Sequence, residues 1–222
     1  MSEGRFETRG VTDNRAYDYA AHPVDVRAEH ALIVEWVPEG ARVLDLGCGN
    51  GTLLARLDRE RRVRGVGIDI ADSGVAQSLA KGLDVRRGSI DVPLDFPDDS
   101  FDIAICNVTI QMVMYPEVLL SEMRRLAPVL IVSFANFAFI KNRIDYFLAG
   151  RMPRPMLFGY KWYDTGHIHQ LSLLDFLDLC DEIGLRVEEA RFRRHRLPLV
   201  DWLYRRWPNV FTSIPILKLR RA

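Results

Sequence analysis

The amino-acid sequence predicts an α/β protein built on a doubly wound, mostly parallel sheet of seven strands, with helices on both faces. Three observations predict this fold. Short apolar runs alternate with helical patterns of roughly 10–15 residues. Several of these runs are continuously apolar, as in strands that are covered on both faces. A turn with three glycines, Gly47 to Gly51, joins the first run to a helical pattern.

The composition is that of one domain with a full core, since 48% of the 222 residues are apolar. We expect a single domain over residues 1–222, with a polar N-terminal arm at 1–25. Thirty basic and thirty acidic residues balance, which argues against nucleic acid as a partner. The three cysteines show no Cys-x-x-Cys spacing, and no apolar run approaches the length of a membrane span. A cytoplasmic protein without a membrane partner is therefore expected.

The first predicted helix covers Val26 to Trp36, where apolar residues recur at helical intervals. Pro38 and Gly40 end it. Tyr17 and Tyr19 precede this helix, and they could either cover a ligand or pack under the arm.

The first predicted strand, Val43 to Leu46, runs into the glycine turn and then into a helix that begins at Thr52. Glycines at 47, 49 and 51 let a ligand approach the main chain and tolerate positive φ. The free N–H groups at the helix start suit a carboxylate or phosphate. A dinucleotide fingerprint needs its third glycine at the sixth position, which Thr52 occupies here, so that fingerprint is absent.

A second strand, Arg64 to Asp69, ends in an acid 24 residues after Asp45, and an acid near that separation can hold ribose hydroxyls. The alternative for Asp69 is a cap of the helix at 71–80. Asp45 either contacts a cofactor or orders the amides of the glycine turn. Cys48 and Ile70 adjoin these acids, and we expect both to contact the cofactor.

A short third strand at Leu83 to Gly88 is expected near an edge of the sheet. The buried fourth strand, Phe101 to Asn107, leads to Gln111, and a helix follows at 117–126. Open α/β sheets bind ligands beyond the carboxyl ends of their strands. We therefore expect Asn107 and Gln111 to contact the cofactor.

The fifth strand, Val129 to Phe134, is followed by an excursion at 137–170 that departs from the strand–helix alternation and is rich in aromatic residues at 160–163. We expect it to form a lid or acceptor pocket. His167 and His169, with Asp164 nearby, could act as a base and its orienting partner. Alternatively, the histidines hold the loop by hydrogen bonds; no metal site is expected.

Two further strands, at 185–192 and 211–219, and helices at 173–183 and 198–206 complete the predicted fold, with the last strands forming an antiparallel pair.

The pattern Asp45-x-Gly-x-Gly-x-Gly resembles motif I of the class I S-adenosylmethionine-dependent methyltransferases, whose fold is Rossmann-like. In that pattern, an acid after the third strand recognises the adenine amine, but Ser89 stands at this position. Asp91 could take over the contact, with Ile90 on the purine face; a solvent-facing Asp91 is the alternative.

Three later strings resemble the MetW family of methionine biosynthesis: Ile131 to Phe137, Leu148 to Pro153, and Trp162 to Cys180. The chain departs from that family at Ser89, Ala135, Gly166 and His167, so His169, which fits the pattern, ranks above His167. The resemblance implies a role tied to homoserine acylation, often as partner of the acyltransferase.

The leading hypothesis is a methyltransferase that converts S-adenosylmethionine to S-adenosylhomocysteine and acts on a small-molecule acceptor. The alternative is a non-catalytic partner of a homoserine O-acyltransferase. A nicotinamide oxidoreductase ranks third because the glycine spacing is wrong for a dinucleotide.

Overall fold

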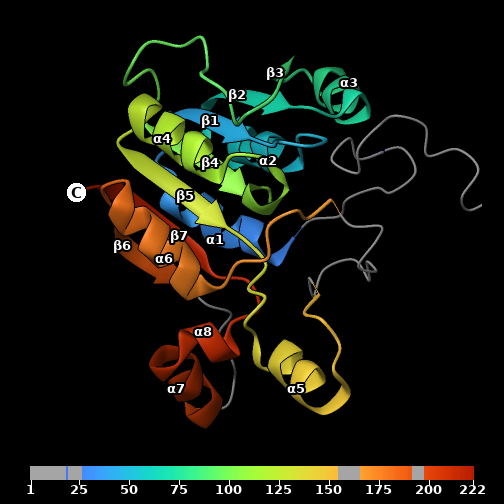
Figure 1. Cartoon of the computed structure of the whole chain (residues 1–222). Helices are drawn as coiled ribbons and strands as arrows, with labels where there is room; N and C mark the ends of the chain where they lie inside the picture. Colours follow the sequence, from blue (N-terminus) through green and yellow to red (C-terminus); the bar gives the residue numbers. More distant parts are fainter. Residues whose placement is uncertain (1–18, 20–26, 155–165, 192–197) are drawn as a thin grey trace, which may run out of the picture.

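The computed structural model describes residues 19, 27–154, 166–191 and 198–222. Within these ranges seven strands form one sheet: β1 (Arg42–Leu46), β2 (Arg64–Asp69), β3 (Asp84–Arg87), β4 (Ile103–Asn107), β5 (Val129–Ser133), β6 (Leu185–Arg191) and β7 (Ile216–Arg221). The strand order is β3-β2-β1-β4-β5-β7-β6 (Figure 1). Strands β1 to β5 pair in parallel, whereas β7 is antiparallel to both β5 and β6. The predicted fold class is confirmed.

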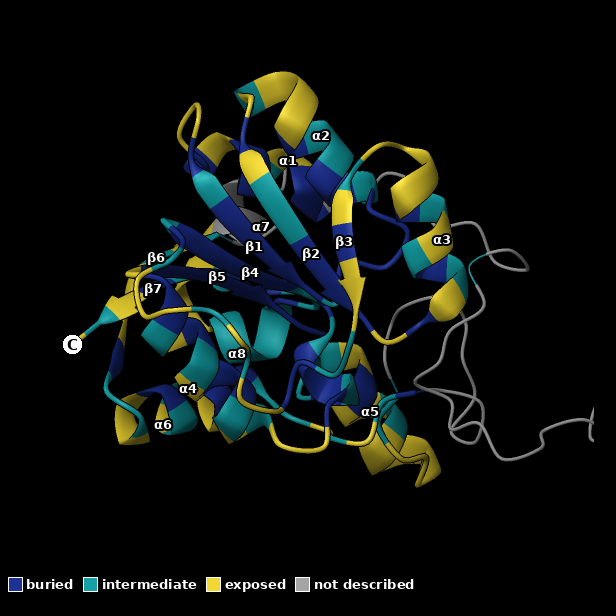
Figure 2. Cartoon of the chain, turned by 90° about the horizontal axis from the view of Figure 1, so that it is seen from above, coloured by how far each residue is buried: buried dark blue, intermediate teal, exposed yellow. Residues whose placement is uncertain are grey.

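Helices cover both faces of this sheet (Figures 1 and 2). One face packs against α1 (Ala28–Trp36), α2 (Thr52–Arg61) and α3 (Asp72–Ala80), and the other packs against α4 (Pro116–Leu126) and α6 (Leu173–Glu182). Strand β5 lies inside the sheet, between β4 and β7, and each of its residues is buried, as its almost entirely apolar sequence predicts. The helices α7 (Pro198–Arg206) and α8 (Pro208–Phe211) precede β7.

The strand order reverses beside β1, which pairs with β2 on one side and with β4 on the other. The chain runs outward from β1 to β3 and then returns to β4. Such a reversal leaves a crevice beyond the carboxyl ends of the two strands, and ligands of doubly wound sheets bind there. The topology therefore places any binding site next to the glycine turn that follows β1.

The sequence predicted most elements to within a few residues. Strand β3 lies at the edge of the sheet, and β6 and β7 form the expected antiparallel pair. Strand β7 begins at Ile216, later than the predicted 211, because Phe211 closes the short helix α8, which starts at Pro208. Helix α6 begins at Leu173, as predicted, and its N-cap residue Ser172 accepts a hydrogen bond on its hydroxyl from the Asp175 amide in a capping box.

The excursion after β5 contains α5 (Ile140–Ala149), which stands away from the sheet (Figure 1). Gly150 ends this helix in a left-handed conformation. The predicted lid residues 155–165, including Asp164, and the predicted arm apart from Tyr19 lie outside the described residues. Among the helices that are described, none is long and apolar enough to cross a membrane.

Candidate functional site

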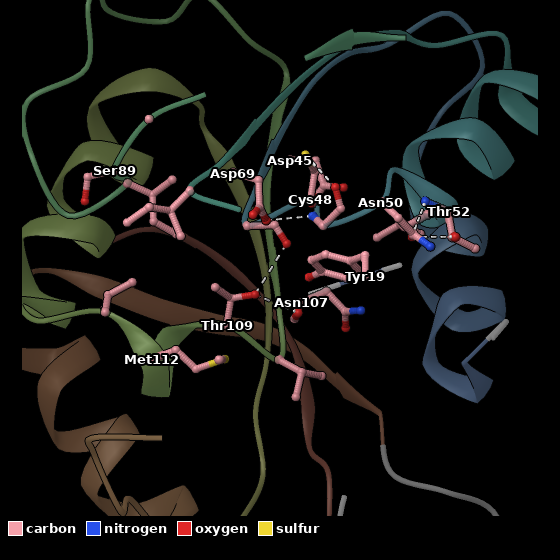
Figure 3. Close-up of a pocket in the computed structure, with 18 of the residues that line it drawn as sticks. Tyr19, Asp45, Cys48, Asn50, Thr52, Asp69, Ser89, Asn107, Thr109 and Met112 are labelled. Atoms are coloured by element: carbon pink, nitrogen blue, oxygen red, sulfur yellow. Dashed lines mark hydrogen bonds between the residues drawn. The ribbon is translucent and has the colours of Figure 1, made fainter. Parts of the chain in front are cut away.

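A pocket opens at the carboxyl ends of β1, β2 and β4 (Figure 3). It encloses about 1180 Å³, including the part that is open to solvent. Its walls come from the first turn of α1, the glycine turn, the ends of β2, β3 and β4, and the segment that contains His167.

Within the glycine turn, Gly49 keeps the pocket open. Its φ is +57°, and a Cβ built on it would lie 2.5 Å from the Tyr19 hydroxyl, so this position faces the cavity. Gly47 also has no room for a side chain, since its Cβ would lie 2.4 Å from the Cγ2 atom of Thr109, which follows β4. The sequence assigned both glycines to ligand approach. At both positions φ is positive and a Cβ would clash with a side chain that lines the pocket, Thr109 at Gly47 and Tyr19 at Gly49, so packing already requires glycine at each, and ligand approach stays a prediction.

Asp69 ties the end of β2 to the glycine turn. One carboxylate oxygen accepts a hydrogen bond from the Gly49 amide at 2.7 Å, and the other accepts one from the Ala71 amide at 2.8 Å. Ala71, not Asp69, is the N-cap residue of α3, so the helix-cap alternative does not hold. Asp69 lines the pocket, and burial raises its pKa although the hydrogen bonds oppose that shift. Each oxygen keeps a second lone pair for a ligand hydroxyl.

Asp45 lies in the pocket wall with a carboxylate oxygen that lacks a partner. The side chain is 2% exposed, and Oδ2 accepts no hydrogen bond. Burial, with a contribution from the charge on Asp69, raises the pKa of Asp45 to about 7. The amides of Gly47 and Cys48 donate to the Ile68 carbonyl, so Asp45 does not order the turn. A buried oxygen without a partner is rare in proteins and suits a cationic ligand group.

The pocket wall after β3 contains Ser89, Ile90 and Asp91. Asp91 is buried, which excludes the solvent-facing alternative. Its carboxylate accepts hydrogen bonds from the Ser89 hydroxyl, the Met114 amide at 2.7 Å and the Tyr115 amide at 3.3 Å. Burial raises its pKa, but these bonds outweigh burial and lower it. Asp91 therefore braces two loops at the pocket.

Apolar surface for a flat ring comes from Ile70 and Ile90. Both side chains line the pocket, and Ile70 is 37% exposed. Cys48 lies in the same wall, where burial raises the pKa of its thiol.

Of the two residues predicted at the end of β4, Asn107 lines the pocket and Gln111 does not. Gln111 is fully buried, and its side-chain amide exchanges two hydrogen bonds with the main chain of Ala135, at 2.8 and 3.0 Å. The Gln111 carbonyl also accepts hydrogen bonds from the amides of Ile168 and His169. In this structure Gln111 joins three segments behind the pocket and is not part of its surface.

The two candidate histidines occupy different places. His167 lines the pocket, and burial, together with the charge on Arg27, lowers its pKa to about 4. His169 is not part of the pocket wall, and its Nε2 lies 3.3 Å from the Met114 carbonyl oxygen. That contact requires the ring to donate, so Nε2 carries the proton. The sequence ranked His169 above His167 as a candidate base, whereas His167 is the one that lines the pocket. No three potential metal ligands cluster within the described ranges.

Sequence reasoning did not single out Arg27 and His30, which also line the pocket. His30 is 3% exposed, its Nδ1 has no hydrogen-bond partner, and burial lowers its pKa to about 4. One signal could have revealed it: His30 shares a helix face with Ile33 and Val34, which are buried. Tyr19 lies against the glycine turn in the pocket wall (Figure 3).

The sequence is similar to a known protein family and to a characterised relative. The family described as "Methionine biosynthesis protein MetW" matches residues 27–219. A bifunctional methionine biosynthesis protein, MetXA/MetW, from Rhodopirellula baltica is 33% identical over 193 residues, covering 80% of this chain. The alignment spans 31% of that relative's length.

Solved structures share the fold at low identity. A Haloferax volcanii methyltransferase in complex with its activator Trm112 has a TM-score of 0.62 at 20% identity and covers 87% of this chain and 88% of its own. Magnesium protoporphyrin IX methyltransferase from Synechocystis PCC 6803, with bound S-adenosylhomocysteine, has a TM-score of 0.60 at 19% identity and covers 87% of this chain and 82% of its own. The fold is therefore that of the class I methyltransferases, and the match over residues 27–219 shows that the chain belongs to the MetW family.

Proposed function

We propose that this protein is a methyltransferase that uses S-adenosylmethionine and acts on a small-molecule acceptor. The observation that carries the proposal is the unpartnered, buried oxygen of Asp45 beside the open glycine turn, with Asp69 at the end of the next strand. Asp45 would pair with the ammonium group of the cofactor, and Asp69 would accept hydrogen bonds from its ribose hydroxyls. Ile70 and Ile90 supply the apolar surface that an adenine ring needs.

When bound, S-adenosylmethionine supplies a methyl group on a positively charged sulfur. The chain must then align the acceptor with that methyl group and, for some acceptors, remove a proton. His167 is placed to accept a proton at a ring nitrogen because it lines the pocket. Its pKa of about 4 keeps the ring neutral near pH 7 but makes it a weak base. We therefore expect methyl acceptors whose reacting group loses its proton readily without a strong base.

Calorimetry with S-adenosylhomocysteine tests this proposal, and Asp69→Ala is the informative variant. We expect the wild-type protein to bind, and the variant to lose roughly 1.5–3 kcal/mol, the scale of hydrogen bonds to a charged group. Asp95→Ala, at a residue outside the pocket wall, is the matched control. Unchanged affinity in Asp69→Ala would remove this carboxylate from the site. Release of S-adenosylhomocysteine from S-adenosylmethionine and a metabolite pool then tests turnover.

A second candidate function is that of a partner for a homoserine O-acyltransferase. It is favoured by the relative in which MetXA and MetW are joined in one bifunctional protein. Helix α5 has a suitable surface, because Phe147 is 86% exposed and Leu148 75% exposed, with Ile144 and Tyr146 also exposed. Contiguous exposed apolar side chains of this kind mark interaction sites on soluble proteins.

Co-purification with an acyltransferase tests this second function. We expect Phe147→Ser to weaken the complex, whereas Leu79→Ser, at an exposed leucine on α3, should leave it intact. Turnover by the purified chain without a stable partner would contradict the subunit function.

A further inference from the structure

Tyr19 is a pocket residue that lies outside the part of the chain matched by the family. The family match begins at residue 27, so Tyr19 precedes it. Its side chain nevertheless lines the pocket, and Figure 3 shows the ring below the glycine turn. A residue from before the family-matched region therefore forms part of the surface that a ligand in this pocket would meet.

Two glycines from different elements leave room for the Tyr19 ring. A Cβ built on Gly49 would lie 2.5 Å from the Tyr19 hydroxyl oxygen, and one built on Gly74, in the first turn of α3, would lie 3.0 Å from Tyr19 Cδ2. Both distances are shorter than ordinary van der Waals contact between carbon and its neighbours. A side chain at either position would therefore push the ring away from the turn.

The main chain of Tyr19 is held at the same place. Its amide donates a hydrogen bond of 3.0 Å to the hydroxyl of Ser73, which precedes Gly74 in α3. Ser73 itself is not part of the pocket wall. This bond joins residues 54 positions apart in the sequence and fixes the tyrosine relative to the glycine turn.

Tyr19 forms part of the pocket wall and does not fill the pocket. With the tyrosine in place, the cavity encloses about 1180 Å³, including the part that is open to solvent, and Asp45, Asp69, Ile70 and Ile90 remain on its surface. The tyrosine is half-buried, so it contributes both to the cavity and to the surface of the protein. An aromatic ring in such a position can pack against a bound ligand and keep water from it.

We propose that Tyr19 packs on the bound cofactor beside the glycine turn and slows its release. This inference rests on the proposed function, because it takes S-adenosylmethionine as the ligand of this pocket. Gly49 indicates which part of the cofactor is covered. Its Cβ position faces the Tyr19 hydroxyl, and its amide donates to the Asp69 carboxylate. The ring therefore lies next to the ribose assigned to Asp69.

The rate of S-adenosylhomocysteine release, measured by stopped-flow, tests this inference, with calorimetry for the affinity. We expect Tyr19→Ala to raise both the dissociation rate and the dissociation constant by about 5- to 30-fold, the scale of losing an aromatic contact in a binding site. Tyr19→Phe keeps the ring and should stay within about threefold of wild type. Trp202→Ala, at an exposed aromatic residue of α7 outside the pocket wall, is the control.

Ser73→Ala tests the contact without changing the pocket wall. It removes the acceptor of the Tyr19 amide, so it should weaken S-adenosylhomocysteine binding by about two- to fivefold. In the Tyr19→Ala background it should cause no further loss, because its effect acts through the position of the ring. Melting temperatures of all these variants show whether any loss comes from misfolding.

An unchanged release rate in Tyr19→Ala would overturn the inference. Equal losses in Tyr19→Ala and Tyr19→Phe would also overturn it, because the hydroxyl and not the ring would then make the contact. Tighter binding in Tyr19→Ala would show that the ring occupies the place of the cofactor, and additive losses from Ser73→Ala and Tyr19→Ala would show that Ser73 does not act through the ring; either result contradicts the inference. Failure of the wild type to bind S-adenosylhomocysteine would instead defeat the proposed function itself.

Discussion

The two walls of the pocket differ in how the chain builds them. The acidic wall, which carries Asp45, Asp69 and Asp91, is mostly local: the strand β1, the glycine turn and the start of α2 are consecutive, and Asp69 accepts a hydrogen bond from the Gly49 amide from the neighbouring strand. The basic wall is assembled from distant parts, since Arg27 and His30 begin the first helix while His167 follows the fifth strand. A wall built from consecutive elements can therefore be encoded in a short spacing pattern, whereas a wall built from separate segments depends on how those segments come together.

The largest expected effect comes from closing the acidic wall. Gly49→Val places a branched side chain at a positive φ and in the space now next to Tyr19, so we expect binding of S-adenosylhomocysteine to be lost. Gly82→Val is the matched control, because Gly82 also has a positive φ but no atom lies within 4 Å of its Cβ position. Both variants should lose stability, and only Gly49→Val should lose binding. Equal binding by the two variants would show that the cofactor does not lie on this turn.

The second prediction concerns the unpartnered Asp45. Its pKa is about 7 in the folded protein, against an ordinary value near 3.8 in the unfolded chain. As the pH rises between these values, the unfolded chain releases this proton before the folded protein does, so the free energy of unfolding falls, by up to roughly 3–4 kcal/mol. The variant Asp45→Asn has no titratable group at this position, so its free energy of unfolding should not show this decrease.

Denaturant unfolding at about pH 4 and pH 7.5 measures this difference. The stability of Asp45→Asn relative to wild type should increase with pH, because the buried charge is absent from the variant. The same variant should bind S-adenosylhomocysteine more weakly at pH 7.5, since it offers no charge to the ammonium group. If the relative stability does not change with pH, Asp45 is not a buried carboxyl with a raised pKa.

The smallest expected effect separates the two histidines. His169→Asn should leave S-adenosylhomocysteine affinity within about twofold of wild type and retain most turnover, because His169 donates to the Met114 carbonyl outside the pocket wall. His167→Asn removes a side chain from the wall itself and should lower turnover further. Turnover assays on both variants check this order. A larger loss in His169→Asn than in His167→Asn would restore the order that the sequence alone suggested.

Much of the acidic wall could be predicted from the sequence, because glycine spacing and the acid at the end of the second strand follow from the chemistry of one βα unit. Gln111 could not be predicted in the same way. Its position after β4 pointed to the pocket, but the 3₁₀ turn at Ile110–Met112 directs its side chain to the backbone of Ala135. Position at a strand end did not fix the direction of this side chain.

Most of the basic wall could not be predicted from the sequence. His30 lies in a helical pattern that also explains an ordinary buried face, and a single arginine such as Arg27 at the start of that predicted helix is usually a solvated charge. His167 and His169 are two residues apart, so their spacing alone could not decide which of them faces the cavity. The contacts of Gln111 with the amides of 168 and 169 settle the path of this segment, and those contacts are long-range.

The central claim is that the acidic wall holds the cofactor, and a crystal structure of the protein with S-adenosylhomocysteine tests it most directly. We predict that the ribose hydroxyls lie within hydrogen-bond distance of Asp69, with the ammonium group at Asp45 and the adenine ring between Ile70 and Ile90. A complex in which the ribose contacts neither oxygen of Asp69 would contradict the assignment of the acidic wall to the cofactor.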